Sequence, residues 1–204
     1  MDNMKEYIKY KKRYLKLKNM INNQYGGEIK NAAVLLILTY NGIQYVLLLK
    51  HDYDNVKNKW GTPGGKIDNN ETSEKTAFRE LKEETDIDIN FDEDKMLKYP
   101  FREKYRTEYF IVPTNEKHDV KLSNEHSSYD WFKLLDLINL VNRTVTNITG
   151  IDKHEMINND DLISYFRSTF IQLLDKKIII DNDDDVGCSN VKWINQLMMY
   201  KSYP

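Results

Sequence analysis

The sequence lacks the features that would stabilise a protein by covalent or metal cross-links, or that would direct it to a membrane or a secretory route. Its 204 residues contain one cysteine, Cys188, so an intramolecular disulfide and a cysteine-based zinc site are both excluded. No apolar run reaches the length of a bilayer span. The N-terminus is charged from Lys5 onward, unlike a secretory signal. We therefore expect a soluble cytoplasmic protein with no membrane partner.

An excess of either charge is also missing. Lys and Arg total 30 against 32 for Asp and Glu, which gives a net charge of -2. No overall positive field indicates nucleic-acid binding, although a local patch could still bind RNA. What is present is a hydrophobic fraction of 40%, typical of a globular chain and sufficient for one full core.

Residues 1–27 differ from the rest, and we predict two parts: a basic amphipathic helical leader over 1–27 and a single domain over 28–204. Apolar and aromatic residues recur in the leader at steps of three and four: Tyr7, Tyr10, Tyr14, Leu17 and Ile21. The helix could pack on the domain, pair with a copy of itself in a homodimer, or contact an anionic surface. The run from Tyr10 to Lys18 followed by Gly26-Gly27 resembles leaders of giant DNA virus proteins, which implies the host cytoplasm or the virion as location.

The remaining pattern predicts strands around one central helix. Residues 32–40 and 45–49 form a hairpin joined by Asn41-Gly42, a strong two-residue turn signal. A helix is expected over 73–85 with Thr72 as N-cap. Strands are expected over 105–112 and 129–134, and helices over 135–141, 160–175 and 191–200. This order is that of an α+β or α/β sandwich.

Three carboxylates of the 73–85 helix carry the chemical signal. Glu80, Glu83 and Glu84 are spaced i, i+3 and i+4, so they share one helix face and repel one another. A divalent cation would remove that repulsion, and Mg²⁺ and Mn²⁺ prefer oxygen ligands and bridge to phosphates. Arg79 could pair with Glu83 or clamp a preceding carboxylate. The alternative is an ordinary solvated acidic helix, because Glu and Lys are common helix formers.

The full spacing resembles the Nudix box, which is Gly, five residues, Glu, seven residues, then Arg-Glu-aliphatic-any-Glu-Glu-any-Gly-aliphatic. Eight of its nine defined positions match here: Gly65, Glu71, Arg79, Glu80, Leu81, Glu83, Glu84 and Ile87. Asp86 stands where the family has glycine. That position ends the helix in a left-handed conformation, which Asp adopts at some cost, so we expect the turn to survive. The resemblance extends over about residues 30–140.

The resemblance implies a fold, a cofactor and roles. The fold would be the Nudix α/β/α sandwich with a mixed sheet, plus the N-terminal basic helix and extra C-terminal helices. Glu80, Glu83 and Glu84 would bind Mg²⁺ or Mn²⁺, with the Gly65 carbonyl as a further ligand. Arg79 would orient a catalytic glutamate and Glu71 would support the site.

The resemblance leaves two candidates for the general base. Family members use either a glutamate inside the box or one in a later loop, and we favour Glu80 over Glu125. His126, beside Glu125, is interpreted as a solvated loop histidine.

Substrate contacts are less specific in the sequence. Arg102, Lys104 and Arg106 alternate, so on a strand they would share a face, either for substrate phosphates or as a charged sheet edge. Trp60, Tyr53 and Phe101 could stack on a base or belong to the core.

We expect hydrolysis of a diphosphate linkage in a nucleoside diphosphate derivative or nucleoside triphosphate. The alternatives are viral mRNA decapping with release of m7GDP from capped RNA, inositol pyrophosphate hydrolysis, and a non-catalytic nucleotide-binding module. Because every box glutamate is present, the catalytic reading is favoured over the last alternative.

Overall fold

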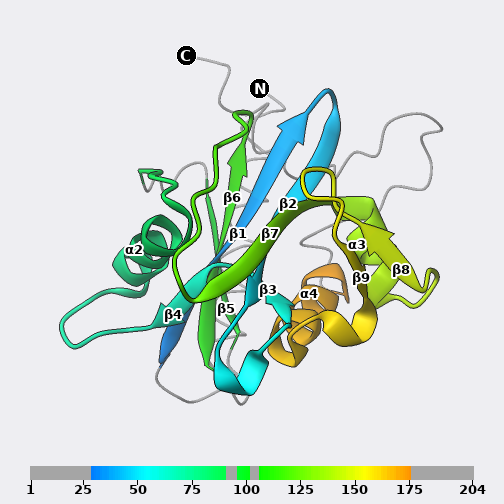
Figure 1. Ribbon diagram of the computed structural model, residues 1–204. Coiled ribbons are helices and arrows are strands. Elements are labelled where there is room, and N and C mark those ends of the chain that lie inside the picture. The colour runs from blue at the N-terminus through cyan, green and yellow to red at the C-terminus, as the bar shows by residue number, and fades with distance from the viewer. Residues whose placement is uncertain (1–28, 91–95, 102–105, 176–204) are drawn as a thin grey trace, which may run out of the picture.

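A computed structural model describes residues 29–90, 96–101 and 106–175 (Figure 1). The expected leader over 1–27, the helix over 191–200, Arg102 and Lys104 lie outside these residues. The described strands are β1 (Asn31–Tyr40), β2 (Ile43–His51), β3 (Trp60–Gly61), β4 (Gly64–Lys66), β5 (Leu97–Phe101), β6 (Thr107–Thr114), β7 (His126–Lys133), β8 (Asn147–Thr149) and β9 (Met156–Asn158). The helices are α2 (Ser73–Thr85), α3 (Leu134–Val141) and α4 (Ser164–Asp175), with 3-10 turns η1 (Asp54–Val56) and η2 (Asn159–Asp161).

The hairpin predicted around Asn41-Gly42 is present. Tyr40 pairs with Ile43, which leaves a two-residue loop in which Asn41 has φ 50 and Gly42 has φ 76. Both values are left-handed, as a type I′ turn requires, and its twist matches that of the two strands. The turn sequence therefore sets the register of β1 and β2.

The hairpin forms the centre of a mixed seven-stranded sheet. Along its main path the strand order is β3-β2-β1-β6-β5, with β4 paired to β1 and β7 paired to β2. β1 and β6 run parallel and the other pairs are antiparallel. Because β7 pairs with β2, the loop before β7 lies beside the end of β2, where Asp52 N donates to Glu125 O at 2.9 Å.

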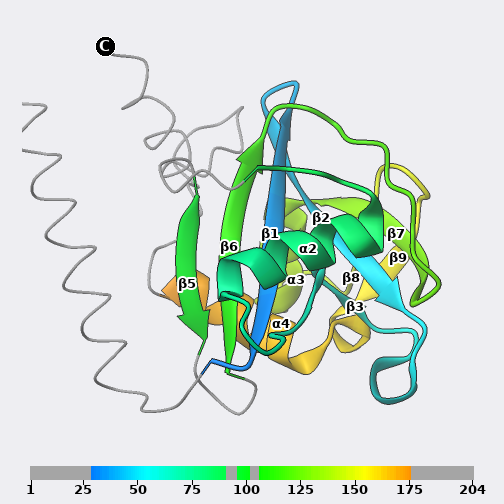
Figure 2. The same cartoon turned by 90° about the vertical axis from the view of Figure 1, so that its left-hand side faces the viewer.

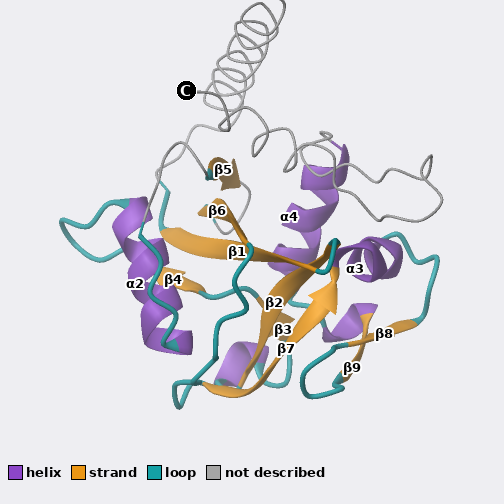
Figure 3. Ribbon diagram, turned by 90° about the horizontal axis from the view of Figure 1, so that it is seen from above, coloured by secondary structure: helices purple, strands orange, loops and turns teal. Residues whose placement is uncertain are grey.

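The sheet is covered on both faces, with α2 on one side and α3 and α4 on the other (Figures 2 and 3). Alternate residues of β1 enter the two layers. Val34 and Leu36 belong to the cluster that contains Leu81 of α2. Leu35 belongs to the cluster that contains Phe166 of α4. A strand buried on both faces reads as a continuous apolar run, which accounts for residues 32–38. The predicted α/β/α sandwich with a mixed sheet is confirmed.

Helix α2 has the bounds that the sequence predicts. The Thr72 side chain accepts a hydrogen bond from Lys75 N at 3.3 Å, so Thr72 is the N-cap. At the other end Asp86 is left-handed, with φ 59 and ψ 12, and its N–H donates to Lys82 O. Asp86 thus ends the helix in the conformation that glycine favours, and the turn survives as expected.

Several boundaries differ from the prediction. β6 begins at Thr107, because Arg106 has a left-handed φ of 47 and its carbonyl instead accepts hydrogen bonds from Lys30 N and Asn31 N. The helix expected over 160–175 begins at Ser164, after a separate turn capped by Asn158. Strands β3, β4, β5, β8 and β9 were not predicted from sequence. Among the described residues no helix has the length and apolar character needed to cross a membrane.

Candidate functional site

The candidate site lies along one face of α2, opposite strand β4. Two adjacent glycines bring the strand close to the helix. A Cβ on Gly64 would overlap the Ala32 carbonyl and Ala33, and a Cβ on Gly65 would overlap the Glu80 carboxylate. A side chain at Gly64 would therefore push β4 away from β1, and one at Gly65 would displace the Glu80 side chain of α2. The close approach that glycine allows places the Gly65 backbone beside a carboxylate.

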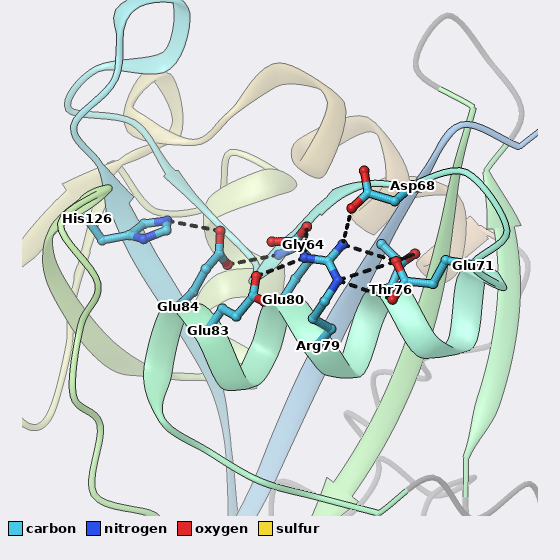
Figure 4. A network of polar contacts seen from close by, with 9 residues as sticks. All are labelled: Gly64, Asp68, Glu71, Thr76, Arg79, Glu80, Glu83, Glu84 and His126. Atoms are coloured by element: carbon cyan, nitrogen blue, oxygen red, sulfur yellow. Dashed lines mark hydrogen bonds and ion pairs between the residues drawn. The ribbon is translucent and has the colours of Figure 1, made fainter.

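Arg79 joins three of the carboxylates (Figure 4). Its Nη2 lies 3.1 Å from Glu71 Oε2, and its Nη1 lies 3.0 Å from Glu80 Oε1 and 2.8 Å from Glu83 Oε2. The Thr76 hydroxyl also donates to Glu71 Oε2 at 2.7 Å. These hydrogen bonds from Arg79 and Thr76 lower the pKa of the Glu71 carboxyl. Glu71 is thus a fixed anion that orients the guanidinium, which in turn orients Glu80 and Glu83.

Glu84 is the buried member of the carboxylate face. Its side chain is 6% exposed, against 59% for Glu83 one residue before it. Gly64 N donates to Glu84 Oε2 at 3.0 Å. Burial outweighs that hydrogen bond and, helped by the charge of Glu80, raises the pKa of Glu84 to about 9. Without a cation nearby, this carboxyl therefore keeps its proton at neutral pH.

Glu125 comes from a different part of the chain and joins the same cluster. It is exposed in the loop before β7, and its charge raises the pKa values of Glu84 and Glu80, in each case after the larger effect of burial. Burial also raises the pKa of Tyr53, and the charges of Glu84, Glu125 and Glu80 add to that shift. The fold therefore brings both candidate bases, Glu80 and Glu125, to one group of carboxylates.

His126 differs from its interpretation as a solvated loop histidine, which was wrong. It is the first residue of β7 and is 6% exposed, and its Nε2 lies 3.7 Å from Glu84 Oε1. Its ring is 4.7 Å from that of His51, which is buried at the end of β2. Burial lowers the pKa of His126 to about 4 and that of His51 to about 3, so both rings are neutral at pH 7.

The residues considered for substrate binding differ in their exposure and in the elements that carry them. Trp60 is 2% exposed and packs edge-on against Phe132 at 5.4 Å, so of the two roles considered for it, base stacking and core packing, the structure shows core packing. Arg106 has a left-handed φ of 47 and lies in the turn before β6, whereas Arg102 and Lys104 lie outside the described residues. Tyr53 remains available, since it is 44% exposed and contacts His51 edge-on.

The donor set fits a hard divalent cation. Glu80, Glu83, Glu84 and Glu125 offer oxygen atoms only, and the Gly65 backbone adjoins Glu80. Within the described ranges no three acidic, histidine or cysteine side chains already converge on one point. In the structure the Arg79 guanidinium forms ion pairs with both Glu80 and Glu83 (Figure 4). Burial raises the pKa of Glu84 most, and the charges of Glu80, Glu125 and Glu83 each add to that shift.

Sequence reasoning missed the buried His51 and misjudged the burial of His126. His51 ends an apolar strand and His126 follows a polar loop, so neither has the spacing of a motif. His126 directly follows Glu125, the loop candidate for the base, and His51 is its partner where β2 and β7 pair.

Comparison with known proteins agrees with this geometry. The family model described as NUDIX domain matches residues 29–151, more than half of the chain. The asymmetrical bis(5'-nucleosyl)-tetraphosphatase of Caenorhabditis elegans is 30% identical over 118 residues, covering 55% of this chain and 84% of that protein. Dihydroneopterin triphosphate diphosphatase of Haemophilus influenzae is 26% identical over 140 residues, 61% of this chain and 87% of that protein. A Nudix hydrolase of M. smegmatis shares the fold, with a TM-score of 0.50 at 16% identity over 75% of this chain and 89% of its own. The chain therefore belongs to the NUDIX family and is a Nudix hydrolase.

Proposed function

We propose that the protein hydrolyses a diphosphate linkage in a nucleoside triphosphate or nucleoside diphosphate derivative, with Mg²⁺ or Mn²⁺ as cofactor. The observation that carries this proposal is the carboxylate face of α2. Glu80, Glu83 and Glu84 lie on it, the Glu125 charge acts on it, and the single guanidinium of Arg79 contacts two of its members. Two relatives are named for acting on small polyphosphates, one on bis(5'-nucleosyl) tetraphosphates and one on dihydroneopterin triphosphate, which favours this class over capped RNA.

The residues of the site have distinct tasks in this proposal. Glu83 and Glu84 hold the cation together with Glu80, and the Gly65 carbonyl is a further donor. The bound cation neutralises phosphate charge and acidifies the attacking water. Binding requires Glu84 to lose its proton, so affinity for the metal rises with pH over the range in which Glu84 titrates. Glu71 holds Arg79, and Arg79 keeps Glu80 and Glu83 oriented between turnovers.

The general base must accept a proton from the attacking water. Glu80 is our first candidate, because its side chain is 16% exposed and adjoins the Gly65 backbone at the centre of the site. Burial raises the pKa of Glu80, which makes it a better proton acceptor than a solvated glutamate. Glu125 is the second candidate. Because Glu80 is also a proposed metal ligand, Glu80→Gln and Glu125→Gln are compared at saturating metal, where loss of the base should still reduce kcat by about 10²–10⁴-fold.

The test is product release with Mg²⁺ or Mn²⁺ from a panel of nucleoside triphosphates, dinucleoside polyphosphates, nucleoside diphosphate sugars, capped RNA and an inositol pyrophosphate. Glu83→Gln and Glu84→Gln are expected to abolish turnover. Glu116→Gln is the matched control, because Glu116 is exposed in the loop after β6 and should leave turnover unchanged.

The best substrate of the panel decides between the classes. Preference for capped RNA or for the inositol pyrophosphate would replace small nucleotides in this proposal. If no panel member is turned over while nucleotides still bind, the protein is a binding module and the catalytic proposal is wrong.

A further inference from the structure

The two oxygens of Glu84 have different surroundings. Oε2 accepts a hydrogen bond from Gly64 N at 3.0 Å. Oε1 faces His126 Nε2 at 3.7 Å, which is longer than a hydrogen bond (Figure 4). His126 Nε2 is buried and has no other partner among the described residues. A buried ring nitrogen without a partner calls for a physical explanation, and the nearest polar atom is a carboxylate of the metal-binding face.

The Ser123 hydroxyl is placed to favour the His126 tautomer that carries the ring proton on Nε2. The Ser123 hydroxyl oxygen accepts a hydrogen bond from Glu125 N at 3.4 Å and lies 3.4 Å from His126 Nδ1. The hydroxyl hydrogen is then free to be donated to Nδ1, which leaves the ring proton on Nε2. In this arrangement the N–H of Nε2 points at Glu84 Oε1. Ser123 N also donates to the Glu84 carbonyl at 3.1 Å, so one loop residue positions both the helix end and the histidine.

His51 supports the His126 ring from the other side. The two rings lie 4.7 Å apart with an interplanar angle of 57°. Neither nitrogen of His51 has a partner within the part of the chain that the structure describes. Space for this ring depends on Gly61, since a Cβ there would lie 3.0 Å from His51 Nε2. The 3.7 Å separation of His126 Nε2 and Glu84 Oε1 exceeds the length of a normal hydrogen bond by about 0.5 Å, so a small shift of the Glu84 side chain closes it.

We propose that His126 is a positioning residue that donates from Nε2 to Glu84 Oε1 when Glu84 binds the metal, and that Ser123 and His51 hold it for this task. The inference deepens the proposed function and rests on its metal site. Donors behind a ligating carboxylate orient its lone pairs, and their loss typically weakens metal binding about 10- to 100-fold.

The experiment measures Mn²⁺ affinity of the full chain from the electron paramagnetic resonance signal of free Mn²⁺, without substrate. The variants are His126→Leu and His126→Met, which fill the space without a donor, and His126→Gln, which supplies an amide N–H. His118→Leu is the matched control, at a half-buried histidine of the same segment that faces the Thr114 hydroxyl at 3.4 Å. Thermal unfolding in EDTA records the folded state of each variant.

We expect Mn²⁺ binding to weaken about 10- to 100-fold in the donor-free variants and to return in His126→Gln. Turnover of the donor-free variants should recover toward the wild-type kcat as the metal concentration rises, which a purely structural defect would not allow. Unchanged Mn²⁺ affinity in the folded donor-free variants would overturn the inference, and so would an equal loss in His118→Leu. Absence of Mn²⁺ binding by the unaltered protein would refute the metal site of the proposed function and the inference with it.

Discussion

Substitution of Glu84 by Gln should stabilise the metal-free protein and remove its stabilisation by metal. Glu84 is buried, and its pKa is raised from 4.5 to about 9. The stability that the protonated Glu84 carboxyl contributes is fully present below pH 4.5. It is lost progressively as the pH rises from 4.5 through the folded-state pKa of about 9, because the unfolded chain releases the proton first. About 2.5 pH units separate 4.5 from pH 7, so at about 1.4 kcal/mol per unit the loss at pH 7 is about 3 kcal/mol.

Glutamine has the shape of the protonated carboxyl and can still accept the hydrogen bond from Gly64 N, but it does not titrate. In EDTA at pH 7 we therefore expect Glu84→Gln to raise the free energy of unfolding by up to about 3 kcal/mol, or the melting temperature by roughly 6–12 °C for a chain of this size. The stability advantage of Glu84→Gln should shrink below 1 kcal/mol near pH 5, because this pH is only about half a unit above the unfolded-state pKa of 4.5.

Bound metal should reverse the order of stability of the wild type and Glu84→Gln. A cation present at 100 times its dissociation constant stabilises the native protein by about 2.7 kcal/mol. The wild type should gain this stabilisation, whereas Glu84→Gln should gain little. The assay is urea unfolding at pH 5, 7 and 8, in EDTA and in Mn²⁺. In EDTA, Glu83→Gln is the matched control for the stability difference, because Glu83 is exposed and its pair with Arg79 contributes only about 0.5 kcal/mol.

The result that would refute this reasoning is a metal-free Glu84→Gln protein less stable than wild type at pH 7, with a difference that does not change between pH 5 and pH 8. Glu84 would then be ionised in the metal-free fold, and its burial would not control its charge.

Four further substitutions test other parts of the site and fold. Arg79→Lys keeps the charge but loses the planar guanidinium, whose two terminal nitrogens contact Glu71 and Glu83 at the same time. We therefore expect kcat/KM, measured at saturating metal, to fall about 10- to 100-fold. Unchanged kinetics would show that the guanidinium is dispensable. Gly65→Ala should displace the Glu80 carboxylate and lower kcat by about 10²-fold, with Gly42→Ala in the hairpin turn as a stability control far from the carboxylates. Asp86→Gly should raise the urea midpoint slightly without changing turnover, because glycine adopts φ 59 without strain; a lower midpoint would show that the ion pair with Lys121 matters more. Asp130→Asn should lower the free energy of unfolding, measured in urea, by about 3 kcal/mol. The buried Asp130 carboxylate accepts hydrogen bonds from four backbone N–H groups, and an amide cannot accept them all: Trp131 N, Asp152 N, Lys153 N and Glu155 N. A loss below 1 kcal/mol would contradict this role.

Local sequence determined the elements that position the site. The Asn41-Gly42 turn sets the central hairpin because two left-handed residues are compatible with few other conformations. Thr72 and Asp86 begin and end α2, so the helix bounds follow from capping chemistry. Helical periodicity then places Glu80, Glu83 and Glu84 on one face without any tertiary contact. These features depend on neighbours within a few residues, which is why the sequence was sufficient to predict them.

Tertiary structure decided which distant residues meet the carboxylates. The pairing of β2 with β7 brings His51 and His126 together and carries Glu125 to the site, although about 75 residues separate the two strands. The same packing closes Trp60 into the core, where its ring no longer reaches a substrate. The buried Asp130 and the β8–β9 hairpin likewise depend on contacts that no local pattern encodes. The sequence by itself determined the helix face and the chemistry of its oxygen donors. Only the folded sheet decided how deeply Glu84 is buried, and therefore whether it is charged.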